Sequence, residues 1–165
     1  MNTKFVISAY AGVFLMAGVA MAEEGGVEWK TLSTAKVSLQ KGLAAAQQKG
    51  KPISGKFEME HGKLQLSTYT AGKGKYSEVI VDHKSGKVAK TEEIKEGDDL
   101  KHAQAQSEAM AKAKKSLAAA VAHAVVQNKG YRAVSAMPSL ENGAPVAAVV
   151  LENASGSKTV SEKLN

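Results

Sequence analysis

Between residues 33 and 50, apolar positions recur every three or four residues, as they do on one face of a helix. The expected buried face comprises Ala35, Leu39, Leu43 and Ala46. Ser33 has the hydroxyl of an N-cap residue, and Gly50 followed by Pro52 ends the pattern. A helix this short needs a packing partner, because short isolated helices are marginal in water.

Three strand-like segments follow this helix, at about 53–59, 63–70 and 76–82. His61-Gly62 separates the first two, and the glycine-rich stretch 71–75 separates the second from the third. The first half of the chain therefore predicts a helix followed by an antiparallel meander of three strands.

The third segment ends at Asp82-His83, and a new strand starts near Lys87. A structural turn explains this stretch, because Asp82 can accept hydrogen bonds from the following amides and Gly86 can adopt positive φ. The alternative is a catalytic Asp-His pair. That interpretation needs an oriented nucleophile, and the sequence has no G-x-S-x-G elbow or similar motif.

An acidic stretch around residues 92–99 separates the halves, and residues 99–128 then predict one long alanine-rich helix. Asp98 or Asp99 can cap this helix. Its apolar residues recur every seven positions, at Ala103, Met110, Leu117 and Ala124. We expect this narrow stripe to pack on the sheet, with a coiled-coil dimer as the alternative.

The pattern of the first half then returns, because residues 129–143 resemble residues 49–62. Both stretches start with Lys-Gly and finish with Glu-X-Gly, and Asn142-Gly143 is a strong hairpin signal. Two further strands follow, one at 144–153 and one near the end of the chain. The expected fold class is α+β, with two tandem α-β-β-β units, each a helix packed on its own antiparallel sheet. The expected boundaries are a signal peptide at 1–22, a first repeat at 23–96 and a second at 97–165.

The first 22 residues have the pattern of a secretory signal. Lys4 precedes an apolar run from 5 to 20, and Ala20-Met21-Ala22 forms a small-residue cleavage site before Glu23. We expect cleavage after Ala22 and a periplasmic or secreted bacterial protein, with an uncleaved anchor as the alternative. No other segment is apolar enough to span a membrane. The chain has no cysteine, which excludes disulfides and thiolate chemistry.

The formal net charge is +6, and lysine supplies nearly all the positive charge, because Arg132 is the only arginine. Nucleic-acid binding is disfavoured, since arginine forks and stacking aromatic clusters are both missing. Anionic envelope surfaces or an acidic partner protein fit this charge better. A simply solvated lysine surface fits it as well.

No catalytic, cofactor or metal site is expected from the remaining motifs. The four histidines lack metal-ligand spacing, and the stretch 71–75 lacks the frame of a phosphate-binding loop. The carboxylate pair Glu92-Glu93 falls in the expected linker. The pair Asp98-Asp99 suits a helix N-terminus, where negative charge is favoured.

The strand–turn–strand motif at 78–90 and the helix and hairpin before it resemble a PepSY domain. The matching residues are Gly50, Gly62, Val79, Val81, Asp82, Gly86, Lys87 and Val88. The resemblance covers about 33–90, and more weakly about 107–165, where the Asp-to-Gly turn has no counterpart. PepSY domains occur in propeptides of thermolysin-type metalloproteases and in exported bacterial proteins. The resemblance implies a cystatin-like helix-on-sheet fold and a non-catalytic regulator or inhibitor of extracytoplasmic peptidases.

A protein partner, such as an envelope peptidase, is therefore expected, and no cofactor. The candidate partner-binding residues are Tyr69, Lys73, Lys75, Tyr76, Asp82 and His83. The expected structural turn residues are Gly62, Asp82, Gly86, Asn142 and Gly143. The alternative function is a periplasmic binding module that holds a small ligand, a metal or a cell-wall polymer between the two units. An enzyme has the least support.

Overall fold

The computed structural model describes residues 26–165. The predicted signal peptide, its cleavage site and the start of the first repeat lie outside the described residues. Within 26–165, no helix is both long enough and apolar enough to cross a membrane.

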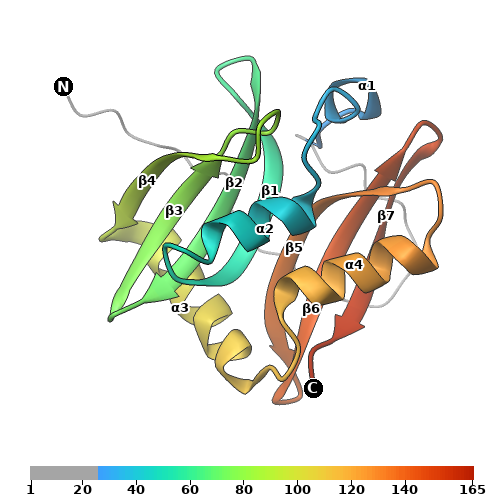
Figure 1. Cartoon of the computed structure of the whole chain (residues 1–165). Coiled ribbons are helices and arrows are strands. Elements are labelled where there is room, and N and C mark those ends of the chain that lie inside the picture. The colour runs from blue at the N-terminus through green and yellow to red at the C-terminus, as the bar shows by residue number, and fades with distance from the viewer. Residues whose placement is uncertain (1–25) are drawn as a thin grey trace.

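Seven antiparallel strands form a single sheet in the order β4-β3-β2-β1-β5-β6-β7 (Figure 1). Neighbours in the sheet are also neighbours in sequence except at the centre, where β1 pairs with β5. The strands are β1 (Lys51–Glu60), β2 (Lys63–Gly72), β3 (Lys75–Val81), β4 (Val88–Ile94), β5 (Arg132–Glu141), β6 (Ala144–Asn153) and β7 (Gly156–Lys163). Glu92 and Glu93, which were expected in a linker, belong to β4.

The expected fold class, two tandem units with a sheet each, is wrong. Gly55 in β1 pairs with Ala136 in β5, and Lys56 pairs with Ser135, so the strands of both halves form one sheet. Two separate sheets would have four edges of unpaired backbone groups, whereas one sheet has two. The pairing of β1 with β5 thus satisfies backbone donors and acceptors that would otherwise face solvent.

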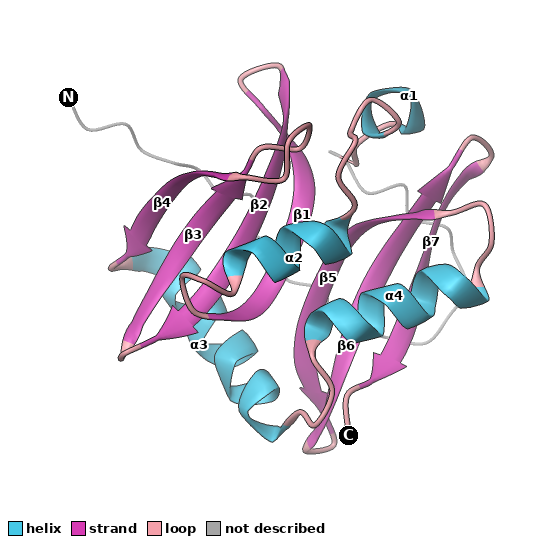
Figure 2. Cartoon of the chain, in the orientation of Figure 1, coloured by secondary structure: helices cyan, strands magenta, loops and turns pink. Residues whose placement is uncertain are grey.

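Helix α3 covers one face of this sheet, and helices α2 and α4 cover the other (Figure 2). The helices are α1 (Trp29–Leu32), α2 (Leu39–Ala46), α3 (Gly97–Lys112) and α4 (Leu117–Gln127). Successive residues of a strand point to opposite faces. Gly55 lies against Leu39 and Leu43 of α2. Ser54 bonds to α3 instead, because its hydroxyl donates to Gln106 Oε1 at 2.7 Å.

The helix expected from Ser33 starts later than predicted. Ser33 follows the short helix α1, and Ser38 caps α2 by accepting a hydrogen bond from Lys41 N at 3.4 Å. The chain is not helical at Lys36 and Val37, because both amides donate to the carbonyl of His83, at 2.9 and 3.0 Å. Most of the predicted apolar stripe is confirmed as a helix face, since Leu39, Leu43 and Ala46 of α2 are buried.

The long helix expected at 99–128 is two helices. The backbone is extended at Ala113, and Ser116 caps α4 by accepting a hydrogen bond from Ala119 N at 3.2 Å. The break is held by the end of the chain, because the amides of Lys114 and Lys115 donate to the carbonyl of Leu164. The N-cap position of α3 is Glu96, so neither Asp98 nor Asp99 caps it. Both aspartates lie in its first turn.

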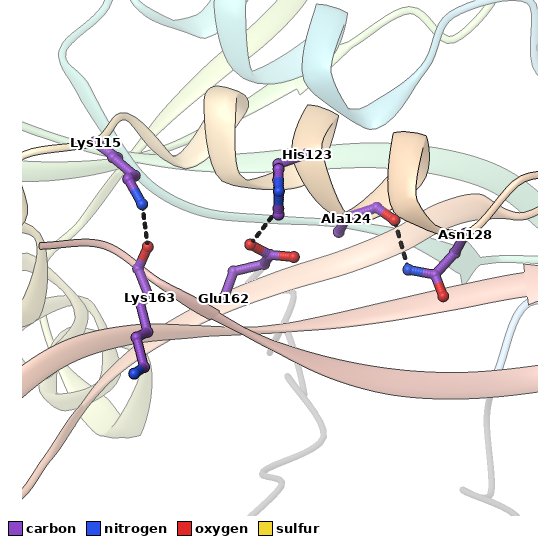
Figure 3. A network of polar contacts seen from close by, with 6 residues as sticks. All are labelled: Lys115, His123, Ala124, Asn128, Glu162 and Lys163. Carbon is purple, nitrogen blue, oxygen red and sulfur yellow. Dashed lines mark hydrogen bonds and ion pairs between the residues drawn. The ribbon is translucent and has the colours of Figure 1, made fainter.

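The last strand is attached to α4 and to the segment just before it by polar contacts (Figure 3). Lys115 Nζ donates to the carbonyl of Lys163 at 3.3 Å, and His123 Nδ1 lies 2.9 Å from Glu162 Oε2. Beyond β7, the side chain of Leu164 is fully buried. The C-terminal segment is therefore part of the core.

Candidate functional site

A groove of about 190 Å³ lies between α3 and the sheet face that α3 covers. Strands β1, β2 and β5 supply its floor, and α3 supplies one wall. Its lining residues are Ser54, Lys56, Tyr69, Asp99, His102, Ala103, Gln106 and Met137. The groove thus combines residues from both halves of the chain.

Local periodicity explains which side chains line the groove. Alternation along β1 directs Ser54 and Lys56 to the α3 face. The α3 residues of the groove are three or four positions apart, so they lie on neighbouring turns of one side of the helix. They are Asp99, His102, Ala103 and Gln106. Gln106 fixes this arrangement, because it accepts from Ser54 and its Nε2 donates to Met137 Sδ at 3.6 Å.

Tyr69 lies on β2 with only 8% of its surface exposed. Its hydroxyl is buried and has no hydrogen-bond partner of ordinary geometry among the described residues. Burial raises the pKa of Tyr69 far above its usual value, and the carboxylates of Glu78, Glu58 and Asp99 raise it further. The phenol therefore stays protonated at physiological pH. An unsatisfied buried hydroxyl of this kind costs about 1–3 kcal/mol of stability.

Two carboxylates near Tyr69 are also perturbed by burial. Burial raises the pKa of Asp99, which His102 and Lys56 partly offset. Burial likewise raises the pKa of Glu78, against a lowering hydrogen bond from Ser67. Lys56 offsets only part of this acidic cluster, because its Nζ forms its ion pair with Glu58, 2.6 Å from Glu58 Oε2.

The structure separates the six residues predicted to bind a partner. Tyr69 lies in the groove. Lys73 lies in the turn before β3, Lys75 and Tyr76 begin β3, and Asp82 and His83 follow its other end. A strand of this length spans roughly 20 Å. The six residues therefore do not form one site.

Asp82 and His83 each have a structural contact. The Asp82 carboxylate accepts hydrogen bonds from the amides of Lys84 at 3.1 Å and Ser85 at 2.6 Å, and these bonds lower its pKa, with that from Ser85 contributing most. Gly86 closes the turn at φ +77°. The His83 carbonyl accepts hydrogen bonds from the amides of Lys36 and Val37. The Nδ1 atom of the His83 ring is buried without a partner among the described residues.

The other predicted turn residues lie in two-residue hairpins. His61 and Gly62 have φ of 49° and 74°, and Asn142 and Gly143 have φ of 50° and 81°. Positive φ at both central positions is the requirement of type I′ turns, whose twist matches that of the flanking strands. These residues therefore set strand register and are remote from the groove.

Sequence reasoning missed most of the groove. Asp99 was considered as a helix cap and as part of a carboxylate pair, and Ser54 and Gln106 were not considered at all. These positions are far apart in the sequence, so no local motif connects them. Within residues 26–165, no group of three or more histidines or acidic residues has a geometry that could hold a metal ion.

Comparisons with protein-family models, with curated proteins and with solved structures found no match to this chain. The resemblance to PepSY domains rests on the motif residues Val79, Val81, Asp82, Gly86 and Val88 and their neighbours. What that resemblance implies about function is therefore a proposal.

Proposed function

We propose that this chain is a non-catalytic, exported bacterial protein that regulates or inhibits an extracytoplasmic peptidase by direct protein–protein contact. The PepSY resemblance and the secretory pattern of residues 1–22 support this proposal. The structural observation that carries it is an open strand edge at β4.

Strand β4 is the outermost strand on one side of the sheet and pairs only with β3 among the described residues. Most of its side chains are exposed, including Ala89, Thr91 and Glu93. An extended segment of a partner can add to such an edge through backbone hydrogen bonds, with side chains giving specificity.

The opposite edge is less accessible. Near the end of β7, the carbonyl of Lys163 already accepts a hydrogen bond from Lys115 Nζ. The next residue, Leu164, accepts the amides of Lys114 and Lys115 at its carbonyl and buries its side chain. These contacts favour β4 over β7 as the edge that receives a partner strand.

Several of the predicted partner-binding residues flank β4. Lys75 and Tyr76 lie beside its last residues, since Tyr76 pairs with Ile94 and Lys75 Nζ lies 3.1 Å from Glu93 Oε2. Asp82 and His83 lie in the turn that leads into the strand. A partner strand on β4 would therefore have these side chains within reach at each end.

The test uses the chain from Glu23 onward, thermolysin-type metallopeptidases and the peptidase activity of a bacterial envelope extract. We expect at least one activity to fall at equimolar protein. Thr91→Pro in β4 should abolish this inhibition, because proline cannot donate a backbone hydrogen bond. Thr159→Pro is the matched control, since it changes an exposed threonine in the other outer strand, β7.

Thermal melts must show that both variants are folded at the assay temperature. The N–H groups of adjacent strand residues point to opposite sides. If Thr91→Pro unfolds the protein, the N–H of Thr91 bonds to β3 and that of Lys90 faces the open edge, so Lys90→Pro takes its place. The inhibitor proposal fails if no peptidase is slowed by stoichiometric protein. If Thr159→Pro alone abolishes inhibition, the partner binds at β7 and not at β4.

The second candidate is a periplasmic binding module for a small ligand, a metal or a cell-wall polymer. The groove beside α3 favours it, because residues of both halves line that groove. A ligand that binds the folded state should raise the melting temperature in a concentration-dependent way. A screen with no thermal shift would leave this candidate without support.

A further inference from the structure

The groove beside α3 contains two polar groups that lack a well-formed hydrogen bond. The Tyr69 hydroxyl is buried near the Glu78 carboxylate and makes no hydrogen bond of ordinary geometry among the described residues. The Asp99 carboxylate forms no ion pair or hydrogen bond with any other residue in the part of the chain that the structure describes. The buried hydroxyl is unfavourable without a well-formed hydrogen bond, and the partly exposed Asp99 carboxylate beside it is free to accept one. A ligand that hydrogen-bonds to both groups would therefore gain binding free energy.

The local charge indicates the sign of that ligand. The chain as a whole carries a formal +6, yet the carboxylates of Glu58, Glu78 and Asp99 all act on Tyr69. Lys56 is already paired with Glu58, and His102 is exposed to solvent. An additional positive charge is therefore favoured in the groove, and an additional negative charge is not.

The remaining lining indicates the body of the ligand. Ala103 and Met137 give the groove an apolar wall. Its volume, about 190 Å³, equals on the order of six water-sized groups. A short alkyl chain with one charged end fills such a space.

We propose that this groove binds an organic cation, namely an ammonium or guanidinium group on a short apolar stem. The charge lies against Asp99, and the stem lies along Ala103 and Met137. The Tyr69 hydroxyl oxygen accepts an N–H of the cation when the side chains around it move apart. The site does not include β4, so this inference stands independently of the peptidase proposal.

The first experiment is an NMR titration of isotope-labelled chain from Glu23 onward with pentylammonium, pentanol and pentanoate. These probes share the alkyl stem and differ in charge. We expect saturable shifts at Tyr69 and at residues 99–106 with pentylammonium only. Equal responses to pentylammonium and pentanol would overturn the proposal, because the acidic groups would then contribute nothing.

Two adjacent aspartates provide a matched pair of variants. Asp99→Asn should weaken pentylammonium binding about tenfold, since hydrogen bonds to charged groups are of that strength. Asp98→Asn makes the same charge change in the same helical turn. Asp98 is largely exposed and pairs with Lys101 at 3.0 Å, so its variant should bind within about twofold of the parent protein. Equal weakening in both variants would indicate general surface attraction and would refute the site.

Tyr69→Phe separates binding from folding. The hydroxyl makes no hydrogen bond of ordinary geometry among the described residues and lies near the Glu78 carboxylate, so its removal should leave the melting temperature unchanged or higher. Pentylammonium binding should weaken several-fold nonetheless. Unchanged binding would remove Tyr69 from the proposed site.

Two further probes distinguish the sources of the cation. N-acetyl-lysine amide represents a basic side chain of a peptide, and N-acetyl-norleucine amide is its neutral counterpart. Tighter binding of the lysine derivative than of pentylammonium indicates a peptide ligand. Weaker binding indicates a free amine. Equal binding of the lysine and norleucine derivatives would contradict the proposal for both sources.

Discussion

Gly42 in α2 lies close against β2, with no room for a larger side chain. A Cβ atom added there would lie 2.6 Å from Leu66 Cδ2 and 3.1 Å from Leu66 Cγ. Leu66 is fully buried in β2, so its side chain cannot turn out into solvent. Gly42→Ala therefore has two opposing effects, a gain in helix propensity and an overpacked contact.

The two effects have known sizes. Replacing glycine by alanine inside a helix gains about 1 kcal/mol. Overpacking a core contact costs about 1–3 kcal/mol. We expect the contact to dominate, because a separation under 3 Å cannot be accommodated without movement of the buried leucine. Gly42→Ala should lower the free energy of unfolding by about 1 kcal/mol.

A double-mutant cycle separates these effects. Leu66→Ala removes the atoms that the new methyl group would meet, and alone it should cost about 2–5 kcal/mol. In that background, Gly42→Ala should stabilise the protein by about 1 kcal/mol, so the sign of its effect reverses. Ala44 is exposed on the same helix. Ala44→Gly therefore measures the propensity contribution alone.

The assay is urea unfolding of the chain from Glu23 onward, followed by far-ultraviolet circular dichroism. Equal slopes of free energy against urea would show that the variants unfold in the same manner. The reasoning is refuted if Gly42→Ala stabilises the parent protein, or if its effect is the same with Leu66 and with Ala at that position. Either result would mean that α2 does not need a glycine to approach β2.

Three further variants test other contacts. Leu164→Ala should cost about 2–5 kcal/mol in urea unfolding, since the side chain is fully buried; a loss below about 0.5 kcal/mol, as for a surface substitution, would contradict a core role for the C-terminus. Arg132→Met keeps an apolar stem but removes hydrogen bonds to two carbonyls of the N-terminal segment. This variant should lower the free energy of unfolding by about 1–3 kcal/mol and red-shift the fluorescence of Trp29, the only tryptophan. Unchanged emission would contradict the role of Arg132 in holding the segment next to Trp29. Burial raises the pKa of Glu78, so the folded state holds that proton more tightly and loses stability as the pH rises through the raised pKa. Glu78→Gln should therefore raise the melting temperature at pH 7 and leave it unchanged at about pH 3, below the unfolded pKa; a lower melting temperature at pH 7 would refute this.

The hairpins of this protein were predictable, because their signals are local. Asn142-Gly143 and His61-Gly62 occupy tight turns with positive φ. The strand expected at 144–153 matches β6 residue for residue. A turn of two residues fixes the register of both flanking strands, so a short stretch of sequence contains enough information to place them.

The helix boundaries were not predictable, because distant residues determine them. Lys36 and Val37 leave the helical path to bond the carbonyl of His83, and the break before α4 depends on the carbonyl of Leu164. Neither partner lies within the window over which periodicity is judged. Gly55 and Ala136 are likewise far apart in the sequence, and their pairing joins the two expected sheets into one.

The break between α3 and α4 explains why the groove could not be derived from the sequence. The seven-residue pattern is real, since Ala103, Met110, Leu117 and Ala124 are all buried, but its first two members face one side of the sheet and its last two face the other. An unbroken helix would have kept all four on one face of the sheet. Because the chain crosses between faces at residues 113–116, the first turn of α3 is brought over β2, and Asp99 lies in the same groove as Tyr69. The proposed cation site therefore depends on the single sheet that both halves form, because α3 and the strands beneath it come from different parts of the chain.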